Sequence, residues 1–213
     1  MGKYGFFNTY EYGVHQKIVN YIDSQKKVLD IGCAEGDLSR EMKINECKIV
    51  GIELDEQSAQ IAKQFCEEVI VGDIESLEIN SKYKNYFDFI VLADILEHLK
   101  EPLEILCRLE YYLKDNGYVI LSLPNIANWR MRIKLLLGKF DYEDQGLLDK
   151  SHLHFYNVKS AKALISDANL EIVNFDVSLN GITKFAKFFY SVSVRWPNLF
   201  AYQFLIIAKK KKN

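Results

Sequence analysis

Residues 28–38, with the sequence VLDIGCAEGDL, decide the fold class of this chain. An apolar run of strand type leads into a turn that contains Gly32 and Gly36, and an amphipathic run follows. In an open α/β sheet, ligands bind in the crevice beyond the carboxyl ends of the strands, where a glycine-rich turn lets backbone N–H groups approach the ligand. The stretch therefore predicts a strand, a ligand-binding turn and a helix.

Short apolar runs alternate with longer amphipathic runs over residues 26–123, as in the strand–helix–strand crossovers of a parallel sheet. The apolar runs are almost continuous, which is typical of strands covered by helices on both faces. We therefore predict a doubly wound α/β sheet. Strands are expected at residues 27–31, 48–52, 69–71, 87–92, 118–123, 170–177 and 200–208. One helix is expected to follow Pro102 and to end at Asn116-Gly117.

The composition favours one folded domain over residues 1–213. Hydrophobic residues make up 49% of the chain, and 27 basic residues face 29 acidic ones. This balance leaves no excess of cations to neutralise a phosphate backbone, so general nucleic-acid binding is not expected. Within the domain we expect an N-terminal helix in 1–25, a ligand-binding core at 26–123, a second functional segment at 124–157 and an insertion at 178–198.

The cysteines and the N-terminus predict a cytoplasmic protein. Four scattered cysteines form no C-x-x-C pair, so they are interpreted as reduced thiols. No apolar signal-peptide region follows the N-terminus, and no apolar run of about 18 residues is present. We expect no stable membrane insertion, and residues 209–212, all lysine, are interpreted as a solvated end.

An acidic residue at the end of the second predicted strand indicates a nucleoside-type cofactor. Glu53 lies about twenty residues after the glycine turn, where it can accept hydrogen bonds from both hydroxyls of a ribose. A dinucleotide fingerprint would require glycine at position 37, but Asp37 would face the pyrophosphate. An NAD-dependent oxidoreductase is therefore disfavoured and kept as an alternative. A cationic cofactor without phosphates, such as S-adenosylmethionine, tolerates such acids.

Five segments resemble, in order, the motifs of class I S-adenosylmethionine-dependent methyltransferases. They are the glycine-rich motif at 30–36, the ribose loop at 51–55, the adenine loop at 71–75, the fourth-strand motif at 87–99 and the turn at 113–118. Ala34 takes the place of the middle glycine. The resemblance implies a Rossmann-like, seven-stranded mixed sheet, mostly parallel with the last strand antiparallel. It also implies that S-adenosylmethionine is converted to S-adenosylhomocysteine.

The same resemblance implies a set of cofactor-binding residues. Gly32 and Cys33 would hold the methionine portion, Glu53 the ribose and Asp73 the adenine amino group. Asp30 and Asp94 would lie near the cofactor ammonium or its waters, although Asp30 could instead only tie down the turn. The complete expected set is Asp30, Gly32, Cys33, Gly36, Glu53, Leu54, Asp73, Ile74 and Asp94.

Residues 124–157 resemble a subgroup of bacterial and archaeal methyltransferases that are similar to ubiquinone-type O-methyltransferases and often lack an assigned acceptor. Long irregular segments in compact domains are usually functional, so we expect an acceptor wall or lid here. His152 is a candidate base, Asp149 could orient it, and His154 is a second candidate. The plainer alternative is that one histidine only bonds loop backbone. The expected acceptor is a small molecule or glycan-type hydroxyl, methylated by in-line displacement.

Asp94, Glu97 and His98 have the spacing of one helix face. Some ubiquinone-type O-methyltransferases use a divalent metal, and these side chains are plausible ligands. The Leu-Glu-His-Leu sequence is frequent across the superfamily, so a structural role is favoured and no metal site is predicted.

Two further hypotheses concern partners. A non-catalytic, nucleoside-binding subunit stays open as an alternative to an enzyme. Aromatic residues at helical spacing after residue 184 are more typical of a core or a homodimer surface than of an acceptor pocket. They are Phe185, Phe188, Phe189 and Tyr190.

Overall fold

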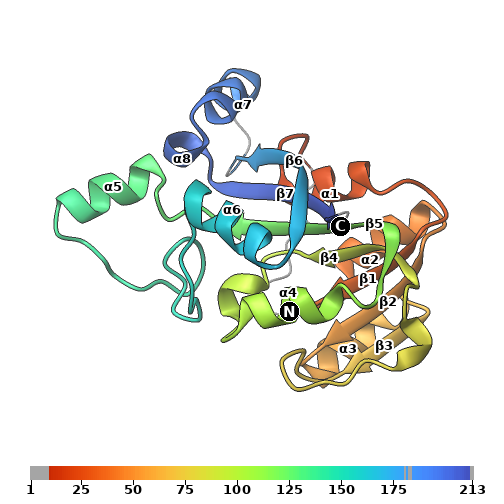
Figure 1. Cartoon of the computed structure of the whole chain (residues 1–213). Coiled ribbons are helices and arrows are strands. Elements are labelled where there is room, and N and C mark those ends of the chain that lie inside the picture. Colours follow the sequence, from red (N-terminus) through yellow and green to blue (C-terminus); the bar gives the residue numbers. More distant parts are fainter. Residues whose placement is uncertain (1–9, 180, 182–183, 212–213) are drawn as a thin grey trace.

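The computed structural model describes residues 10–179, 181 and 184–211. Within this part of the chain, seven strands form one sheet in the order β3-β2-β1-β4-β5-β7-β6 (Figure 1). The strands are β1 Lys27–Ile31, β2 Lys48–Glu53, β3 Glu68–Val71, β4 Phe87–Leu92, β5 Leu113–Pro124, β6 Leu170–Ser178 and β7 Gln203–Lys210. β1 to β5 pair in parallel, and β7 runs antiparallel to β5 and β6. The predicted mixed sheet with an antiparallel last strand is confirmed.

Helices cover both faces of the sheet, as predicted (Figure 1). They are α1 Val14–Tyr21, α2 Asp37–Ile44, α3 Glu56–Ala62, η1 Ser81–Tyr83, η2 Leu96–His98, α4 Pro102–Leu109, α5 Trp129–Leu136, α6 Val158–Asp167, α7 Ala186–Arg195 and α8 Pro197–Phe200. Successive strand residues point to opposite faces. Val28 of β1 therefore packs in one core with Met42 of α2, and Leu29 packs in the other with Leu106 of α4.

The main differences from the sequence-based prediction are the end of the helix after Pro102, the start of β5 and the start of the last strand. The helix after Pro102 ends at Leu109, because Leu113 already pairs with Phe87 across β4 and β5. Gly117 lies in this irregular start of β5, where an added Cβ would approach the Leu113 side chain to 2.7 Å. The last strand begins at Gln203, because residues 197–200 form α8. Strand pairing therefore overrode the local Asn-Gly helix stop.

The predicted segments can be located on this fold. The helix expected in residues 1–25 is α1, and residues 1–9 lie outside the described part. Residues 124–157 leave the end of β5, contain α5, and return through a long loop to α6 (Figure 1). A bridge between Asn125 and Tyr156 closes this segment at its base. Residues 178–198 hold α7 and the start of α8, and residues 180, 182 and 183 lie outside the described part.

Candidate active site

The glycine turn, residues 32–36, joins β1 to α2 through a strained backbone. Gly32, Ala34 and Gly36 have φ values of 68°, 48° and 84°, in the left-handed region that favours glycine. A Cβ on Gly32 would lie 2.1 Å from the Ile95 side chain. Ala34 shows that a methyl group fits at the middle position. The turn therefore favours glycine at both ends, because Gly32 and Gly36 both have a positive φ. At Gly32 a side chain would also clash with Ile95.

Glu53 ties this turn to the end of β2. Its Oε2 accepts a hydrogen bond from the Ala34 N–H at 2.9 Å, and its Oε1 accepts one from the Asp55 N–H at 2.9 Å. Each carboxylate oxygen can accept a second hydrogen bond. Asp55 itself caps α3 by accepting from the Ser58 N–H at 2.8 Å. The carboxylate is thus held rigidly beside the turn, with acceptor capacity that is not used up.

Asp30 lies directly beneath the glycine turn and is buried. Its Oδ2 accepts a hydrogen bond of 2.7 Å from the Ser39 hydroxyl at the start of α2. Burial raises the pKa of Asp30 to about 6, and the nearby Glu53 charge acts in the same direction. A cationic ligand nearby would therefore stabilise the ionised form of the Asp30 carboxyl.

The other predicted cofactor residues have distinct environments. The Cys33 side chain is buried and points over Gly51, whose added Cβ would lie 2.7 Å from the sulfur. Asp73 is exposed and accepts a hydrogen bond from the Glu75 N–H at 2.9 Å, while Ile74 is buried. Leu54 is 69% exposed. These residues follow the carboxyl ends of β1, β2 and β3, so the structure brings the predicted set to one sheet edge.

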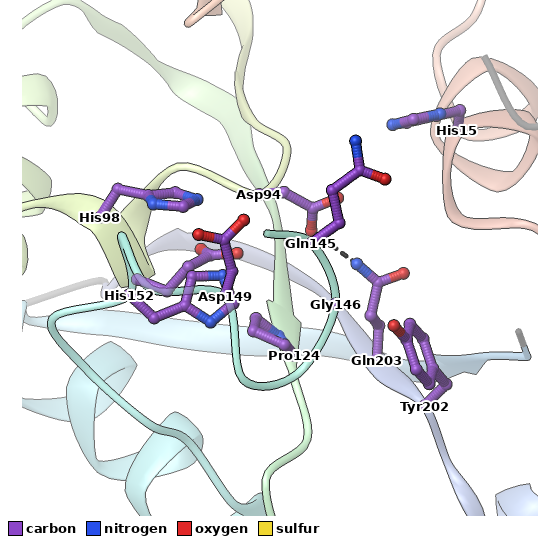
Figure 2. Close-up of a pocket in the computed structure, with 11 residues that line it drawn as sticks. His15, Asp94, His98, Pro124, Gln145, Gly146, Asp149, His152, Tyr202 and Gln203 are labelled. Carbon is purple, nitrogen blue, oxygen red and sulfur yellow. Dashed lines mark hydrogen bonds between the residues drawn. The ribbon is translucent and has the colours of Figure 1, made fainter. Parts of the chain in front are cut away.

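Asp94 links three strands at the carboxyl end of β4. Its Oδ1 accepts hydrogen bonds from the Ser122 hydroxyl at 2.5 Å and from Gln203 Nε2 at 2.7 Å, the second of which is drawn in Figure 2. The Asp94 N–H donates to the Ser122 hydroxyl at 2.9 Å. Its φ is 57°, a left-handed value that Asp tolerates better than most side chains. Asp94 is therefore fixed at the border between the cofactor edge and a neighbouring pocket.

This pocket, of about 300 Å³, lies between the ends of β4, β5 and β7 (Figure 2). The loop of residues 145–152 forms one wall, and α1 contributes from the other side. Its lining residues are His15, Asp94, Glu97, His98, Pro124, Gln145, Gly146, Asp149, His152, Tyr202 and Gln203. We call it the acceptor pocket, after the role that the sequence analysis predicts for residues 124–157. Carboxyl, imidazole and amide groups are all present among these side chains.

Glu97, His98 and His152 form the densest cluster of chemical groups in the pocket. The rings of the two histidines lie 4.8 Å apart, and one potential ligand atom from each of the three residues lies within 4.8 Å of the others. Glu97 is only 2% exposed, and its Oε2 lacks a hydrogen-bond partner, as does His152 Nδ1. An oxygen and two nitrogens at this spacing could hold a divalent cation such as Zn²⁺. Asp94, which the sequence placed in such a set, is replaced in it by His152.

Burial shifts the pKa values of this cluster. Desolvation raises the pKa of Glu97 well above its ordinary value, and the charges of Asp94 and Asp149 add to the effect. Desolvation also lowers the pKa of His152, helped by the neighbouring His98. His152 is therefore neutral near pH 7, the form in which an imidazole can accept a proton.

The three predicted catalytic residues are not all brought together. Asp149 is buried beside His152, but its Oδ1 accepts hydrogen bonds from the Ser151 N–H at 2.8 Å and the Ser151 hydroxyl at 2.5 Å. It thus shapes the turn that carries His152. His154 lies outside the pocket lining, with its Nε2 3.1 Å from the Lys100 carbonyl oxygen. Only His152 and Asp149 share the pocket.

Sequence reasoning missed three pocket residues, which are His15, Tyr202 and Gln203, whereas Gln145 lies in the predicted segment 124–157. Burial lowers the pKa of His15, although the charges of Asp94 and Asp37 oppose this. His15 comes from α1, which carries no recognisable motif. Gln203 was expected inside a strand rather than at its first position. A pattern in the sequence does not reveal either contribution, because both depend on how distant elements meet.

Comparison with known proteins assigns the chain to a family. A family model described as a methyltransferase domain matches residues 12–174. The chain is 27% identical over 117 residues to the ubiquinone biosynthesis O-methyltransferase of Nitrosomonas europaea, which is 50% of each chain. It is 32% identical over 120 residues to that of Haemophilus ducreyi, 50% of this chain and 51% of the relative. The chain therefore spans about half the length of these curated relatives.

Solved structures show the same fold. An S-adenosylmethionine-dependent methyltransferase of Methanosarcina mazei superposes with a TM-score of 0.68 at 20% identity, over 94% of this chain and 100% of that one. The family match opposes the NAD-dependent oxidoreductase that was kept as an alternative above. The chain therefore belongs to the methyltransferase-domain family, and it resembles class I S-adenosylmethionine-dependent methyltransferases of the ubiquinone type.

Proposed function

We propose that the chain transfers a methyl group from S-adenosylmethionine to a hydroxyl oxygen of a polar small molecule or glycan-type acceptor. The observation that carries this proposal is the acceptor pocket, which adjoins Asp94 and contains a neutral histidine. Its volume of about 300 Å³ suits a group of the size of a monosaccharide. Carboxyl, imidazole and amide groups among its lining residues offer hydrogen-bond partners to a polar acceptor.

The residues at the sheet edge fit the cofactor. We assign the glycine turn to the methionine portion, Glu53 to the ribose hydroxyls, and Asp73 with Ile74 to the adenine. Asp30 and Asp94 add negative charge where a cationic ligand without phosphates would lie. When bound, the cofactor supplies a sulfonium methyl group that a nucleophile displaces in line.

His152 is the residue we assign to proton acceptance. Its Nδ1 is buried without a hydrogen-bond partner, and its lowered pKa keeps the ring neutral. A hydroxyl acceptor must lose its proton as the new bond forms, and a positioned histidine serves as base. Asp149 and Ser151 hold the turn that positions this ring. His154 is assigned to loop attachment through the Lys100 carbonyl.

The names of the relatives support oxygen as the methylated atom. The proteins of Nitrosomonas europaea and Haemophilus ducreyi are both ubiquinone biosynthesis O-methyltransferases. The match to each covers about half of that relative. We extend only the reaction class to this chain, and not the acceptor that those names give.

The proposal is tested by labelled methyl transfer into a panel of monosaccharides, polyols, catechols and amines. We expect methylated hydroxyl products, with polar acceptors preferred over catechols. With the best acceptor, His152→Gln lowers kcat by roughly 10²–10⁴-fold without changing cofactor affinity. The matched control His154→Gln leaves kcat within about twofold.

Two outcomes would contradict this assignment. Methylation of amines alone would remove the need for a hydroxyl base. Transfer that is abolished by chelation and restored by Zn²⁺ or Mn²⁺ would assign Glu97, His98 and His152 to a bound cation, since a histidine that ligates a metal through its free nitrogen does not accept a proton there.

A further inference from the structure

A short segment, residues 97–101, lies between the adenine loop at 71–75 and the loop that carries His152. We call it the strap, and it leads from η2 into α4. Leu96, directly before the strap, and Leu99 within it are both buried in the main core. The strap is therefore fixed to the body of the domain, and each loop is attached to it.

Glu75, the last residue of the adenine loop, holds the strap from one side. Its Oε1 accepts hydrogen bonds from the Lys100 N–H at 2.8 Å and from the Glu101 N–H at 3.1 Å. The backbone of Glu75 is held as well, because its N–H donates to Asp73 Oδ1 at 2.9 Å and its carbonyl accepts from Arg108 Nη1 at 3.3 Å. Glu75 thus joins the strap to Asp73, which we assign to the adenine.

The loop that carries the proposed base holds the strap from the other side. The Leu153 and His154 N–H groups donate to the Glu97 carbonyl oxygen at 2.8 and 3.1 Å. His98 Nδ1 lies 3.2 Å from the Ser151 carbonyl oxygen. These contacts involve the residues on both sides of the proposed base in the sequence, so the strap fixes the place of the base in the pocket.

One peptide group makes contact with both loops. The peptide group between Lys100 and Glu101 donates its N–H to Glu75 Oε1 at 3.1 Å, and its carbonyl oxygen lies 3.1 Å from His154 Nε2. A carbonyl oxygen can only accept, so Nε2 is the donor in this contact. Hydrogen bonds in series polarise one another, so each bond strengthens the next. The two loops are thus linked through a single peptide group.

We infer that Glu75 is a positioning residue that couples occupation of the adenine loop to the placement of His152. The inference rests on the proposed function, since it takes Asp73 as the adenine contact and His152 as the base. A bound cofactor holds the adenine loop, and through Glu75 the strap, in one arrangement, so the loop that carries His152 fluctuates less. Such coupling is reciprocal, so an acceptor in the pocket also tightens cofactor binding.

Amide hydrogen exchange in the full chain tests this inference, with S-adenosylhomocysteine as the added ligand. At saturating ligand, exchange of the Leu153 and His154 N–H groups should slow by roughly tenfold in the parent protein. Glu75→Ala should reduce this slowing to less than about twofold, because the strap loses its hydrogen-bond acceptor. Glu75→Gln should restore the slowing, because an amide oxygen can accept from the same two N–H groups.

Glu78 supplies the matched control, since its exposed side chain lies three residues further along the same stretch. Glu78→Ala removes the same charge and should show the slowing of the parent. His154→Ala removes the contact on the other side of the shared peptide group, and it should reduce the slowing to roughly threefold or less. This variant tests the link independently should Glu75→Ala fail to fold, and calorimetric titration with S-adenosylhomocysteine verifies that each variant is folded and saturated.

A second readout uses the best acceptor from the methyl-transfer panel. At saturating cofactor and acceptor, Glu75→Ala should lower kcat roughly tenfold, and Glu75→Gln should stay within about threefold of the parent. A role of Glu75 in folding alone would change the free energy of unfolding and leave kcat at saturation unchanged.

The outcomes separate this inference from the function on which it rests. Ligand binding that does not slow exchange in the parent, or equal slowing in the parent and in Glu75→Ala, overturns the inference alone. Failure of S-adenosylhomocysteine to bind the parent overturns the cofactor assignment and the inference together. The expected pattern of exchange without methylation of any hydroxyl in the panel would contradict the proposed acceptor and support the coupling.

Discussion

At the residue scale, the site depends on acids whose burial a sequence does not display. Asp30 and Glu97 are both almost fully buried, and desolvation raises the pKa of each. Asp30 retains one hydrogen bond from Ser39, whereas Glu97 Oε2 has none. Buried carboxyls of this kind cluster at functional sites, because a bound ligand can supply the hydrogen bonds or the opposite charge that the protein does not.

Cofactor affinity should depend on the ionisation of Asp30. Because its pKa is about 6, the carboxyl is mostly neutral at pH 5 and mostly ionised at pH 7. The ionised form attracts a cationic cofactor, so we expect affinity to rise about tenfold between these pH values. Calorimetric titration with S-adenosylmethionine at each pH measures it.

Asp30→Asn is the control for this pH dependence. The cofactor affinity of this variant should lack the rise between pH 5 and pH 7 that the ionisation of Asp30 causes. The unliganded protein gives a second readout. Since the unfolded carboxyl ionises near 3.8 and the folded one near 6, the free energy of unfolding should fall by about 3 kcal/mol as the pH rises through this interval. Parallel curves for parent and variant would show that another group is responsible.

At the element scale, the glycine turn and the long loop after α5 position the chemistry differently. The turn is fixed by its own backbone and by Glu53. The loop is fixed from outside, because the N–H groups of Leu153 and His154 both donate to the Glu97 carbonyl, at 2.8 and 3.1 Å. His152 is thereby placed against His98 by contacts across about fifty residues of sequence.

Alanine substitutions of two glycines should separate the cost of backbone strain from the cost of side-chain crowding. Gly138 has a φ of 70° with no atom within 4 Å of an added Cβ, so Gly138→Ala should lower the free energy of unfolding by about 1 kcal/mol. An added Cβ on Gly36 lies 2.9 Å from Phe65 and 3.0 Å from the Ala62 backbone. Gly36→Ala should therefore lose roughly 2–4 kcal/mol and weaken cofactor binding. Denaturant unfolding measures both changes. Equal losses of unfolding free energy in the two variants would show that crowding around Gly36 has no effect.

At the scale of the whole molecule, the proposed cofactor and acceptor sites occupy one rim. The carboxyl ends of β1 to β4 carry the residues that we assign to the cofactor, and the acceptor pocket adds β5, β7, α1 and the long loop. Asp94 connects the two through hydrogen bonds to β5 and β7. Ligands at this rim therefore stabilise contacts among elements from both ends of the chain.

Cofactor binding should raise the melting temperature of the whole chain. A ligand at a hundredfold its Kd adds about 2.7 kcal/mol, which for a protein of this size raises Tm by roughly 5–10 °C. Scanning calorimetry with S-adenosylmethionine and S-adenosylhomocysteine should show this rise. NAD should leave Tm unchanged, because Asp37 lies where its pyrophosphate would bind. A comparable rise with NAD would contradict the cofactor assignment.

The sequence by itself determined the sheet, the glycine turn and the cofactor class, because strand apolarity, glycine spacing and the acid at Glu53 are local and periodic signals. Only the tertiary structure decided the acceptor pocket. His15, Gln203 and His152 are separated by long stretches of chain, and no local pattern records their meeting. The tertiary structure also set the end of α4, because pairing between β4 and β5 overrides local helix propensity.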